Sequence, residues 1–382
     1  MLNESPRKFS WLALLISALL LSSCAGHGQA ARQAAADQSA ALAASGYQAA
    51  ESASLTLALQ QWLVLGSQIQ VNLAFPGSGQ KLPLVVYLPG LGETAQGGNR
   101  WRQAWARAGY AVLSLQPLAI DANAWSSELA RSADFKELAR QHLQPAQLQA
   151  RRQMLDAALA EARRRGASGD SLWSRVDFSR VALVGYDLGA QTVLAGPLLE
   201  HFRAAIALSP TVAVESTERP PHFEAGPLLL ISSRRDADPS GRISSAEQRV
   251  ELFDLLPAGD KYLLWFANAS HASLAGSPLT AVDAAAAAPG KRKASGRDEG
   301  GDSGGHGKRR GGGGGNTGNG HSDEQSLSRS MPGAVDLETA AIIEGVSLAF
   351  LDAHLRDRPQ ALRWLQERAA LWMQAQADWR RR

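Results

Sequence analysis

A short segment near the middle of the chain constrains the fold most. Residues 180–195 read Arg-Val-Ala-Leu-Val-Gly-Tyr-Asp-Leu-Gly-Ala-Gln-Thr-Val-Leu-Ala. The apolar run at its start favours a strand, and the residues after the second glycine favour a helix. Gly185 and Gly189 flank Asp187 in a tight turn, where neighbouring backbone comes too close for a side chain. The pattern therefore predicts that Asp187 stands above a sheet, beside a helix N-terminus where negative charge is favoured.

Strand-like and helix-like stretches alternate on both sides of this turn. The run Leu82–Leu88 is nearly all apolar, which is typical of a strand buried on both faces of a sheet. Strands separated by helices predict an α/β protein with a mostly parallel sheet flanked by helices. The expected strands are 55–63, 68–74, 82–88, 110–115, 181–184, 204–208, 228–231 and 261–266, and the expected helices are 101–108, 148–162, 190–199, 337–355 and one after Pro359.

The basic character of the chain lies in one segment. The formal net charge is +3, and residues 286–333 alone carry eight Lys or Arg against five Asp or Glu. Thirteen of the 36 glycines fall between Gly296 and Gly320. Such a segment cannot bury enough apolar surface to fold, so we predict a disordered, basic, Gly-rich insertion over 285–332. The rest of the chain is neutral, which argues against a nucleic-acid partner. For the insertion we expect a solvated surface segment, with contact of residues 286–332 with an anionic envelope polymer as the alternative.

The N-terminus reads as an export signal. Basic residues precede an apolar run of about ten residues that ends in Leu-Ser-Ser-Cys, which resembles a bacterial lipobox. We expect a signal peptide over 1–23 and a lipid anchor, such as palmitate, on Cys24, the only Cys of the chain. The residues after Cys24 favour the outer membrane, facing the periplasm. The Ala-, Gln- and Ser-rich residues 24–51 predict a flexible tether to a core over 52–284, which the helices of 333–382 complete.

Several motifs together resemble the α/β-hydrolase superfamily. They are the Leu-Pro-Gly-Leu-Gly loop after strand 82–88, Gly-Ala-Gln-Thr after Asp187, and a Gly-Asp-Lys-Tyr-Leu-Leu run leading to Ser270-His271. The closest likeness is to dienelactone-hydrolase-like and platelet-activating-factor-acetylhydrolase-like esterases, over roughly 55–274 and the final helices. This resemblance implies an α/β-hydrolase fold with a nucleophile, an acid and a histidine in that order along the chain.

The resemblance assigns a role to each candidate residue. Asp187 takes the nucleophile position, His271 follows the last predicted strand as the base, and Asp236 lies just beyond strand 228–231 as the acid, with Asp238 as the alternative. By motif match, the oxyanion hole consists of the backbone N–H groups of Leu91 and Leu188. Ser209 and Ser270 carry nearby hydroxyls, but neither lies on such a turn, and a structural role is expected for both.

Two departures from the esterase pattern affect the chemistry. Esterases of this kind carry Ser where this chain has Asp187, and commonly His-Gly where it has Pro89-Gly90. An Asp nucleophile is similar to that of haloalkane dehalogenases and epoxide hydrolases. Dehalogenases place Trp where this chain has Leu188, and the segment 211–225 lacks the Tyr donors of an epoxide-hydrolase cap.

These observations leave two functions open. The first is a membrane-anchored hydrolase of small ester-like substrates that uses Asp187, Asp236 and His271; the second is a catalytically degenerate hydrolase that binds a ligand or partner in the cell envelope. A weaker third option is a tethering protein in which the basic insertion is the active part. No cofactor is expected, and the single Cys and the lack of an H-E-x-x-H motif give no metal ligand set.

Overall fold

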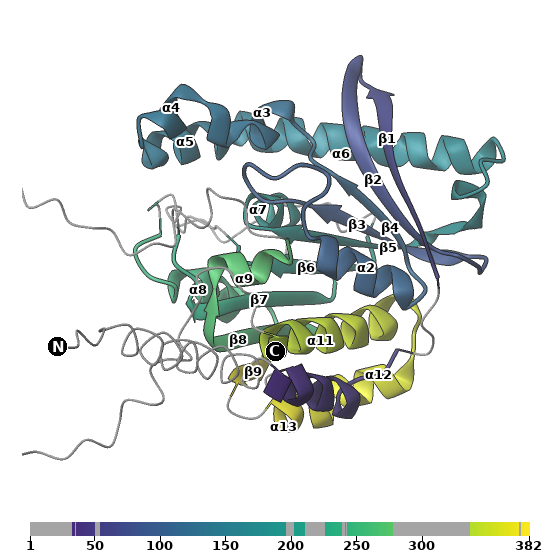
Figure 1. Cartoon of the computed structure of the whole chain (residues 1–382), viewed down its shortest axis with the longest axis vertical. Coiled ribbons are helices and arrows are strands. Elements are labelled where there is room, and N and C mark those ends of the chain that lie inside the picture. Colours follow the sequence, from purple (N-terminus) through teal and green to yellow (C-terminus); the bar gives the residue numbers. More distant parts are fainter. Residues whose placement is uncertain are drawn as a thin grey trace, which may run out of the picture. The chain divides into compact units, whose positions relative to one another are not determined.

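The strands of this protein form one mixed sheet with helices on both faces. The structure is a computed structural model that describes residues 33–34, 36–49, 54–195, 202–210, 226–238, 241, 243–277, 337–373 and 376–382. In these residues the strand order is β1-β2-β4-β3-β5-β6-β7-β8-β9 (Figure 1). The α/β class predicted from the alternating pattern is confirmed. The strands are β1 (Leu55–Val64), β2 (Ser67–Pro76), β3 (Leu82–Leu88), β4 (Ala111–Leu115), β5 (Val176–Tyr186), β6 (Ala204–Leu208), β7 (Leu228–Arg235), β8 (Lys261–Ser270) and β9 (Ala377–Arg381).

The middle of the sheet is parallel and its margins are antiparallel. Parallel pairing joins six consecutive strands of the sheet, in the order β4-β3-β5-β6-β7-β8. The pairs β1–β2, β2–β4 and β8–β9 are antiparallel. Because the parallel strands are almost wholly buried, their apolar residues run without alternation, as the sequence of β3 indicates. The carboxyl ends of these strands meet at one edge of the sheet, where α/β proteins place their sites.

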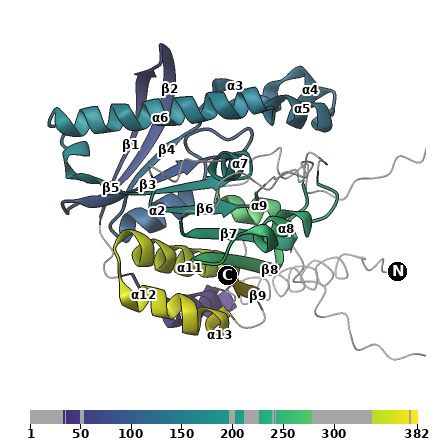
Figure 2. The same cartoon turned by 180° about the vertical axis from the view of Figure 1, so that it is seen from behind.

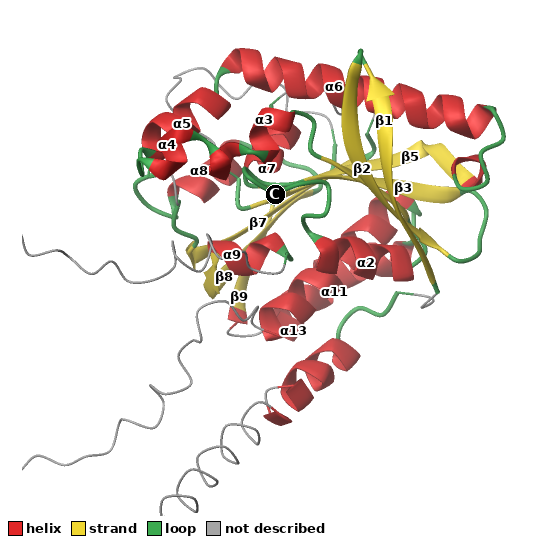
Figure 3. Cartoon of the chain, turned by 45° about the horizontal axis from the view of Figure 1, so that its top comes forward, coloured by secondary structure: helices red, strands yellow, loops and turns green. Residues whose placement is uncertain are grey.

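Each face of the sheet packs against its own set of helices. On one face, α6 (Pro145–Ala167), α7 (Leu188–Leu194) and α8 (Gln248–Leu255) contribute to one apolar core. On the other, α2 (Asn99–Arg107) and α11 (Leu337–Leu355) contribute to a second core, with α9 (His271–Ala275), α12 (Pro359–Arg363) and α13 (Ala369–Met373). Figure 2 shows α6 and α11 on opposite sides of the sheet. Three short helices, α3 (Ala119–Ala122), α4 (Glu128–Arg131) and α5 (Phe135–His142), follow β4 in the chain and precede α6. Figure 3 shows α4 and α5 near one end of α6.

The C-terminal residues differ from the helix predicted after Pro359. The helical part ends at Met373, and β9 follows as an antiparallel neighbour of β8. Trp379 stacks on Tyr262 of β8 at a ring distance of 5.3 Å, and its indole N–H donates to the carbonyl of Leu365. β9 pairs with the edge of β8 that would otherwise be free. The short Arg-rich sequence of β9 does not predict this strand, because its pairing depends on a tertiary contact.

Part of the predicted tether is packed against the body of the protein. Residues 36–45 are helical, and the carbonyl of Leu42 accepts a hydrogen bond from the indole of Trp372 at 3.0 Å. The hydroxyl of Tyr47 donates to Asp352 at 2.6 Å. This segment differs from the free linker predicted over 24–51, because hydrogen bonds of Leu42 and Tyr47 hold it against α13 and α11.

Other predictions concern residues that the structure does not describe. The signal peptide, Cys24, the segment 211–225 and the basic insertion 285–332 all lie outside the described residues. Among the helices that are described, none combines the length and the apolar character needed to cross a bilayer.

Candidate active site

Asp187 occupies a sharp turn between β5 and α7. Its backbone has φ 49° and ψ −109°, a conformation that L-residues rarely adopt. A side chain at Gly185 would meet the carbonyl carbon of Gly189 at 2.3 Å, and one at Gly189 would meet the carbonyl oxygen of Leu88 at 2.1 Å. Both glycines are therefore required by close backbone approach, as the motif predicts. A strained non-glycine residue at such a position is typical of functional sites.

The carboxylate of Asp187 is bound by one of the predicted oxyanion donors. The backbone N–H of Leu91, in the loop after β3, donates to Oδ2 of Asp187 at 3.1 Å. Leu188, the other predicted donor, is the first residue of α7. The motif match expects the Leu91 N–H to donate to a substrate oxygen. In this structure it donates instead to the carboxylate of Asp187.

His271 and Asp236 form a hydrogen-bonded pair at the carboxyl ends of β7 and β8. Nδ1 of His271 lies 2.8 Å from Oδ1 of Asp236. Asp236 is fully buried, whereas the imidazole is 17% exposed. The alternative acid, Asp238, instead accepts from the backbone N–H of Ile243 at 2.9 Å. Of the two candidate acids, Asp236 therefore contacts His271, whereas the carboxylate of Asp238 binds the backbone of its own loop.

Three further side chains, none of them assigned to the site from the sequence, surround the Asp236 carboxylate. Ser209, directly after β6, lies 2.8 Å from Oδ1 of Asp236 and 2.7 Å from Nδ1 of His271. Ser232 donates to Oδ2 at 2.6 Å. The buried guanidinium of Arg249 donates through Nε to the carbonyl of Asp236 at 3.0 Å and lies 3.4 Å from Oδ2. Placement at the ends of parallel strands is the one signal that could have identified Ser209.

Ser270, the other hydroxyl considered from the sequence, has a structural role. Its side chain accepts from the backbone N–H of Ser273 at 3.2 Å and caps the N-terminus of α9. The cap begins the short helix whose first residue is His271, so it fixes the backbone that carries the imidazole.

The charges of the site are coupled. Burial raises the pKa of Asp236, but the hydrogen bond and charge of His271 and the charge of Arg249 outweigh it and hold that pKa below its ordinary value. Burial lowers the pKa of His271, but the hydrogen bond and charge of Asp236 and the charge of Asp187 outweigh it and raise that pKa. The ring of Tyr186 lies 5.1 Å from the imidazole, and burial keeps its own pKa well above the ordinary value. The charges of Asp236 and Asp187 therefore both stabilise positive charge on the imidazole once it has accepted a proton.

The loop of residues 89–93, which we call the oxyanion loop, is held from several directions. The N–H of Gly90 donates to Glu93 at 2.8 Å, and its carbonyl accepts from Gln116 at 2.9 Å. The indole of Trp125 donates to the carbonyl of Leu91 at 3.1 Å. The N–H of Gly92 donates to the backbone carbonyl of Asp121 at 2.8 Å. Peptide groups on both sides of the Leu91 N–H are therefore fixed.

A buried ion cluster supports this loop. The Asp121 carboxylate, which is fully buried, lies 2.6 Å from Nδ1 of His142 and 2.7 Å from Nε of Arg151. Burial raises the pKa of Asp121, but hydrogen bonds from His142 and Arg151 outweigh it and lower the pKa. Because the same residue accepts from Gly92, the cluster connects α5 and α6 to the oxyanion loop.

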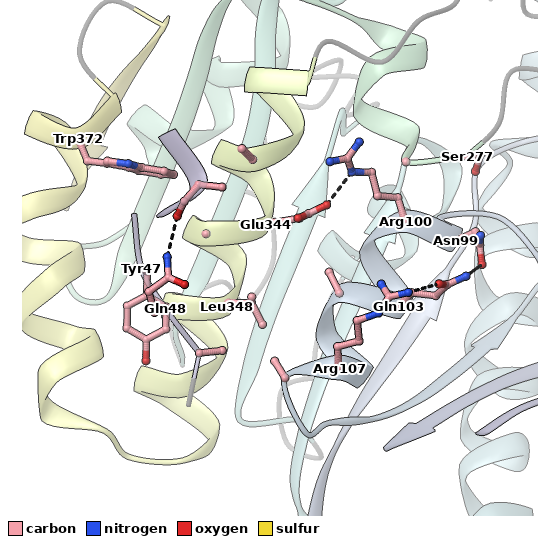
Figure 4. Close-up of a pocket in the computed structure, with 17 residues that line it drawn as sticks. Tyr47, Gln48, Asn99, Arg100, Gln103, Arg107, Ser277, Glu344, Leu348 and Trp372 are labelled. Carbon is pink, nitrogen blue, oxygen red and sulfur yellow. Dashed lines mark hydrogen bonds and ion pairs between the residues drawn. The ribbon is translucent and has the colours of Figure 1, made fainter. Parts of the chain in front are cut away.

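A separate cavity of about 730 Å³ lies between α2, α11 and residues 43–49 (Figure 4). An ion pair of Arg100 with Glu344 at 2.6 Å lines it, together with Trp372 and Leu348. Asp187, Asp236 and His271 do not line this cavity. It is therefore distinct from the site at the carboxyl ends of the strands.

The described part of the chain contains no group of three or more His, Cys, Asp or Glu side chains placed to hold a metal ion. Comparison with protein-family models and with curated proteins gives no match to this chain.

Proposed function

We propose that this protein is an α/β-hydrolase-fold enzyme that hydrolyses small ester-like substrates through a covalent bond to Asp187. The strand order from β1 to β8, with β3 and β4 exchanged, supports this fold, as does the turn at Asp187. The chain order of Asp187, Asp236 and His271 agrees with that of the superfamily.

The observation that carries the proposal is the hydrogen bond from the Leu91 N–H to Oδ2 of Asp187. A donor at this position orients the carboxylate and fixes one of its oxygens. The same donor would stabilise negative charge on Oδ2 when the carboxyl carbon of Asp187 itself becomes tetrahedral. An oxyanion hole directed at the nucleophile fits a reaction in which Asp187 is first alkylated and then hydrolysed.

The first step of this reaction forms an aspartyl ester. Oδ1 of Asp187 attacks an electrophilic carbon of the substrate, and the bond from that carbon to the leaving oxygen breaks with its electron pair. Attack at an alkyl carbon, for instance that of a strained lactone, releases a carboxylate and leaves a stable ester on Asp187. Attack at an acyl carbon would give a reactive anhydride, so the site favours substrates activated at the alkyl carbon.

The second step uses the histidine pair. His271 accepts a proton from water, and the hydroxide attacks the carboxyl carbon of the aspartyl ester while Leu91 stabilises the charge on Oδ2. Asp236, held ionised by His271 and Arg249, stabilises the imidazolium. The tetrahedral species collapses, the alcohol leaves with the proton from His271, and the carboxylic acid formed on Asp187 releases its proton to solvent, which restores the carboxylate.

Removal of the base tests the proposal directly. In His271→Gln the first step remains and the second stops, so the aspartyl ester should accumulate when the protein is incubated with lactones or epoxides. Intact mass spectrometry should show one added substrate mass, and peptide mapping should locate it on Asp187. The matched control, Asp238→Asn on the same background, should keep the adduct, whereas Asp187→Asn should remove it. An adduct that persists in Asp187→Asn would contradict the proposal.

A second function is supported by the same contact. Because the Leu91 N–H already binds Asp187, it is not directed at a substrate carbonyl, as expected of a degenerate hydrolase that binds a ligand. This alternative predicts no turnover and no adduct with the wild-type chain. Ligand binding should then survive in the double variant Asp187→Ala/His271→Ala, which calorimetry would measure.

The location of the protein is a further part of the proposal. The lipobox-like sequence supports an acyl anchor on Cys24 and attachment to the bacterial outer membrane, with the hydrolase domain in the periplasm. The composition of residues 286–332 supports contact with an anionic envelope polymer. Cys24→Ser should release the protein from the membrane fraction, and deletion of residues 286–332 should abolish binding to anionic polymer without removing the anchor.

A further inference from the structure

One face of β1 carries exposed leucines. Leu57, Leu59, Leu63 and Leu65 are 55%, 52%, 70% and 66% exposed, and they alternate with inward residues along the strand and into its turn. Scattered exposed leucines are ordinary, but Leu57, Leu59 and Leu63 share one strand face, with Gln61 between the last two, and Leu65 follows in the turn.

The opposite face of the same strand is well packed. Trp62 and Val64 are buried in the core that β2 and α6 share, and the Trp62 ring contacts Trp173 at 5.4 Å. All ten residues of β1 pair with β2 in unbroken register. The leucines are therefore held outward by an ordered strand, and the hairpin projects past α6 (Figures 1 and 3).

β1 also lacks the features that normally protect the edge of a sheet. It is the terminal strand of the sheet among the described residues, with β2 as its only partner there. Edge strands usually carry Lys, Pro or a bulge that prevents pairing with another chain. Residues 52–80 contain no Lys, Arg, Asp or Glu, and β1 has neither Pro nor a register shift. The edge is long, uncharged and mostly apolar.

We infer that β1 pairs with β1 of a second copy of this chain, antiparallel and about a twofold axis at Gln60. In this register Leu57 lies opposite Leu63 of the second copy, and Leu59 lies beside its Gln61. On the other face Ala58 lies opposite Trp62. Each pair occurs twice by symmetry, so apolar residues meet at the Leu57–Leu63 and Ala58–Trp62 pairs, and uncharged Gln61 meets Leu59.

A second copy accounts for the edge better than other occupants do. About nine paired positions would form roughly eight to ten main-chain hydrogen bonds, as many as a typical protein interface contains. A strand without charge meets its own copy without like-charge repulsion. A bilayer would cover the leucines but would leave the N–H and C=O groups of the edge unpaired.

The oligomeric state tests this inference. The full chain carrying Cys24→Ser, which lacks the anchor site, should sediment as a concentration-dependent dimer. Leu59→Lys/Leu63→Lys should lose the dimer at the same concentration. Leu371→Lys on α13, where the leucine is 72% exposed, is the matched control and should keep it. A wild-type chain that stays monomeric, or whose leucine face binds vesicles as a monomer, would overturn the inference.

Cysteine pairing tests the register independently of those variants. Because Cys24 is the only native Cys, the Cys24→Ser background allows single cysteines to be placed. An equimolar mixture of Leu57→Cys and Leu63→Cys chains should form a disulfide between copies, since opposed Cα atoms lie within the range that a disulfide spans. Leu57→Cys alone should not. Equal crosslinking in both samples would contradict the proposed axis.

Discussion

Two non-glycine residues of the site share the same unusual backbone. Asp187, after β5, and Ser209, after β6, both have φ of 49°, and the N–H of Asp187 donates to the carbonyl of Leu208. Such a φ costs an L-residue about 1–2 kcal/mol. The two strained residues therefore lie at the ends of neighbouring parallel strands, and one of them, Ser209, contacts both Asp236 and His271.

Substitution of Ser209 separates its hydroxyl from its backbone strain. Ser209→Ala loses the hydrogen bond to a buried carboxylate and keeps the positive φ, so the free energy of unfolding should fall by about 1–3 kcal/mol. Ser209→Gly loses the same hydroxyl but adopts this φ without strain, and should recover roughly 1 kcal/mol of that loss. Urea unfolding of both variants measures the difference. A glycine variant less stable than the alanine variant would show that the backbone at this position is not strained.

The titration of His271 reports on the charge of Asp187. Because the fold raises the pKa of His271, the resulting stability is fully present below the ordinary value of 6.5 and is lost as pH rises through the folded pKa. Asp187→Asn removes a charge that favours the imidazolium, so the titration midpoint should move to lower pH. NMR of the imidazole measures this shift, with Asp238→Asn as the control that leaves the midpoint unchanged. An unchanged midpoint in Asp187→Asn would contradict the coupling.

At the scale of elements, the helices after β4 hold the oxyanion loop. Arg151→Lys retains the charge beside Asp121 but loses the two-point contact of the guanidinium, and should lower the free energy of unfolding by roughly 1–3 kcal/mol. The amides of Leu91 and Gly92 should then exchange hydrogen faster, because Gly92 donates to Asp121.

Asp352 on α11 provides a matched control for this variant. It is also a fully buried carboxylate, bound by Arg356 at 2.9 Å and Arg358 at 3.1 Å. Arg356→Lys should cost a similar amount of stability while the Leu91 and Gly92 amides exchange as in the wild type. Equal acceleration of those amides in both variants would indicate a general loosening of the fold and would contradict the positioning role of Arg151.

The sequence predicts a helix, strand or turn where the residues that determine it are close together in the chain. Continuous apolar runs locate the parallel strands. The two glycines around Asp187 predict its turn, because they are needed where backbone segments approach each other closely. The position of Ser209 after a predicted strand is visible in the sequence, but its contacts are not. The partners of Ser209, Arg249 and the Asp121 cluster could not be predicted, since they come from residues that only the folded sheet brings together. The same holds for β9, which becomes a strand through its pairing with β8.

Over the whole molecule, the two margins of the sheet differ. β9 covers one margin, and its charged side chains include Arg380 and Arg381, which protect an edge. β1 forms the other margin of the described sheet without a charged residue. The proposed active-site residues lie at the carboxyl ends of the central strands, so we expect pairing through β1 to leave their chemistry unaltered.

The central claim is that Asp187 forms a covalent ester which water then cleaves at the carboxyl carbon of Asp187. The most direct test is a single turnover of a lactone substrate, with enzyme in excess, in water enriched in ¹⁸O. We predict that the product alcohol contains no heavy oxygen and that the peptide carrying Asp187 gains one. Heavy oxygen in the product, with none on Asp187, would show direct attack by water and would contradict the account.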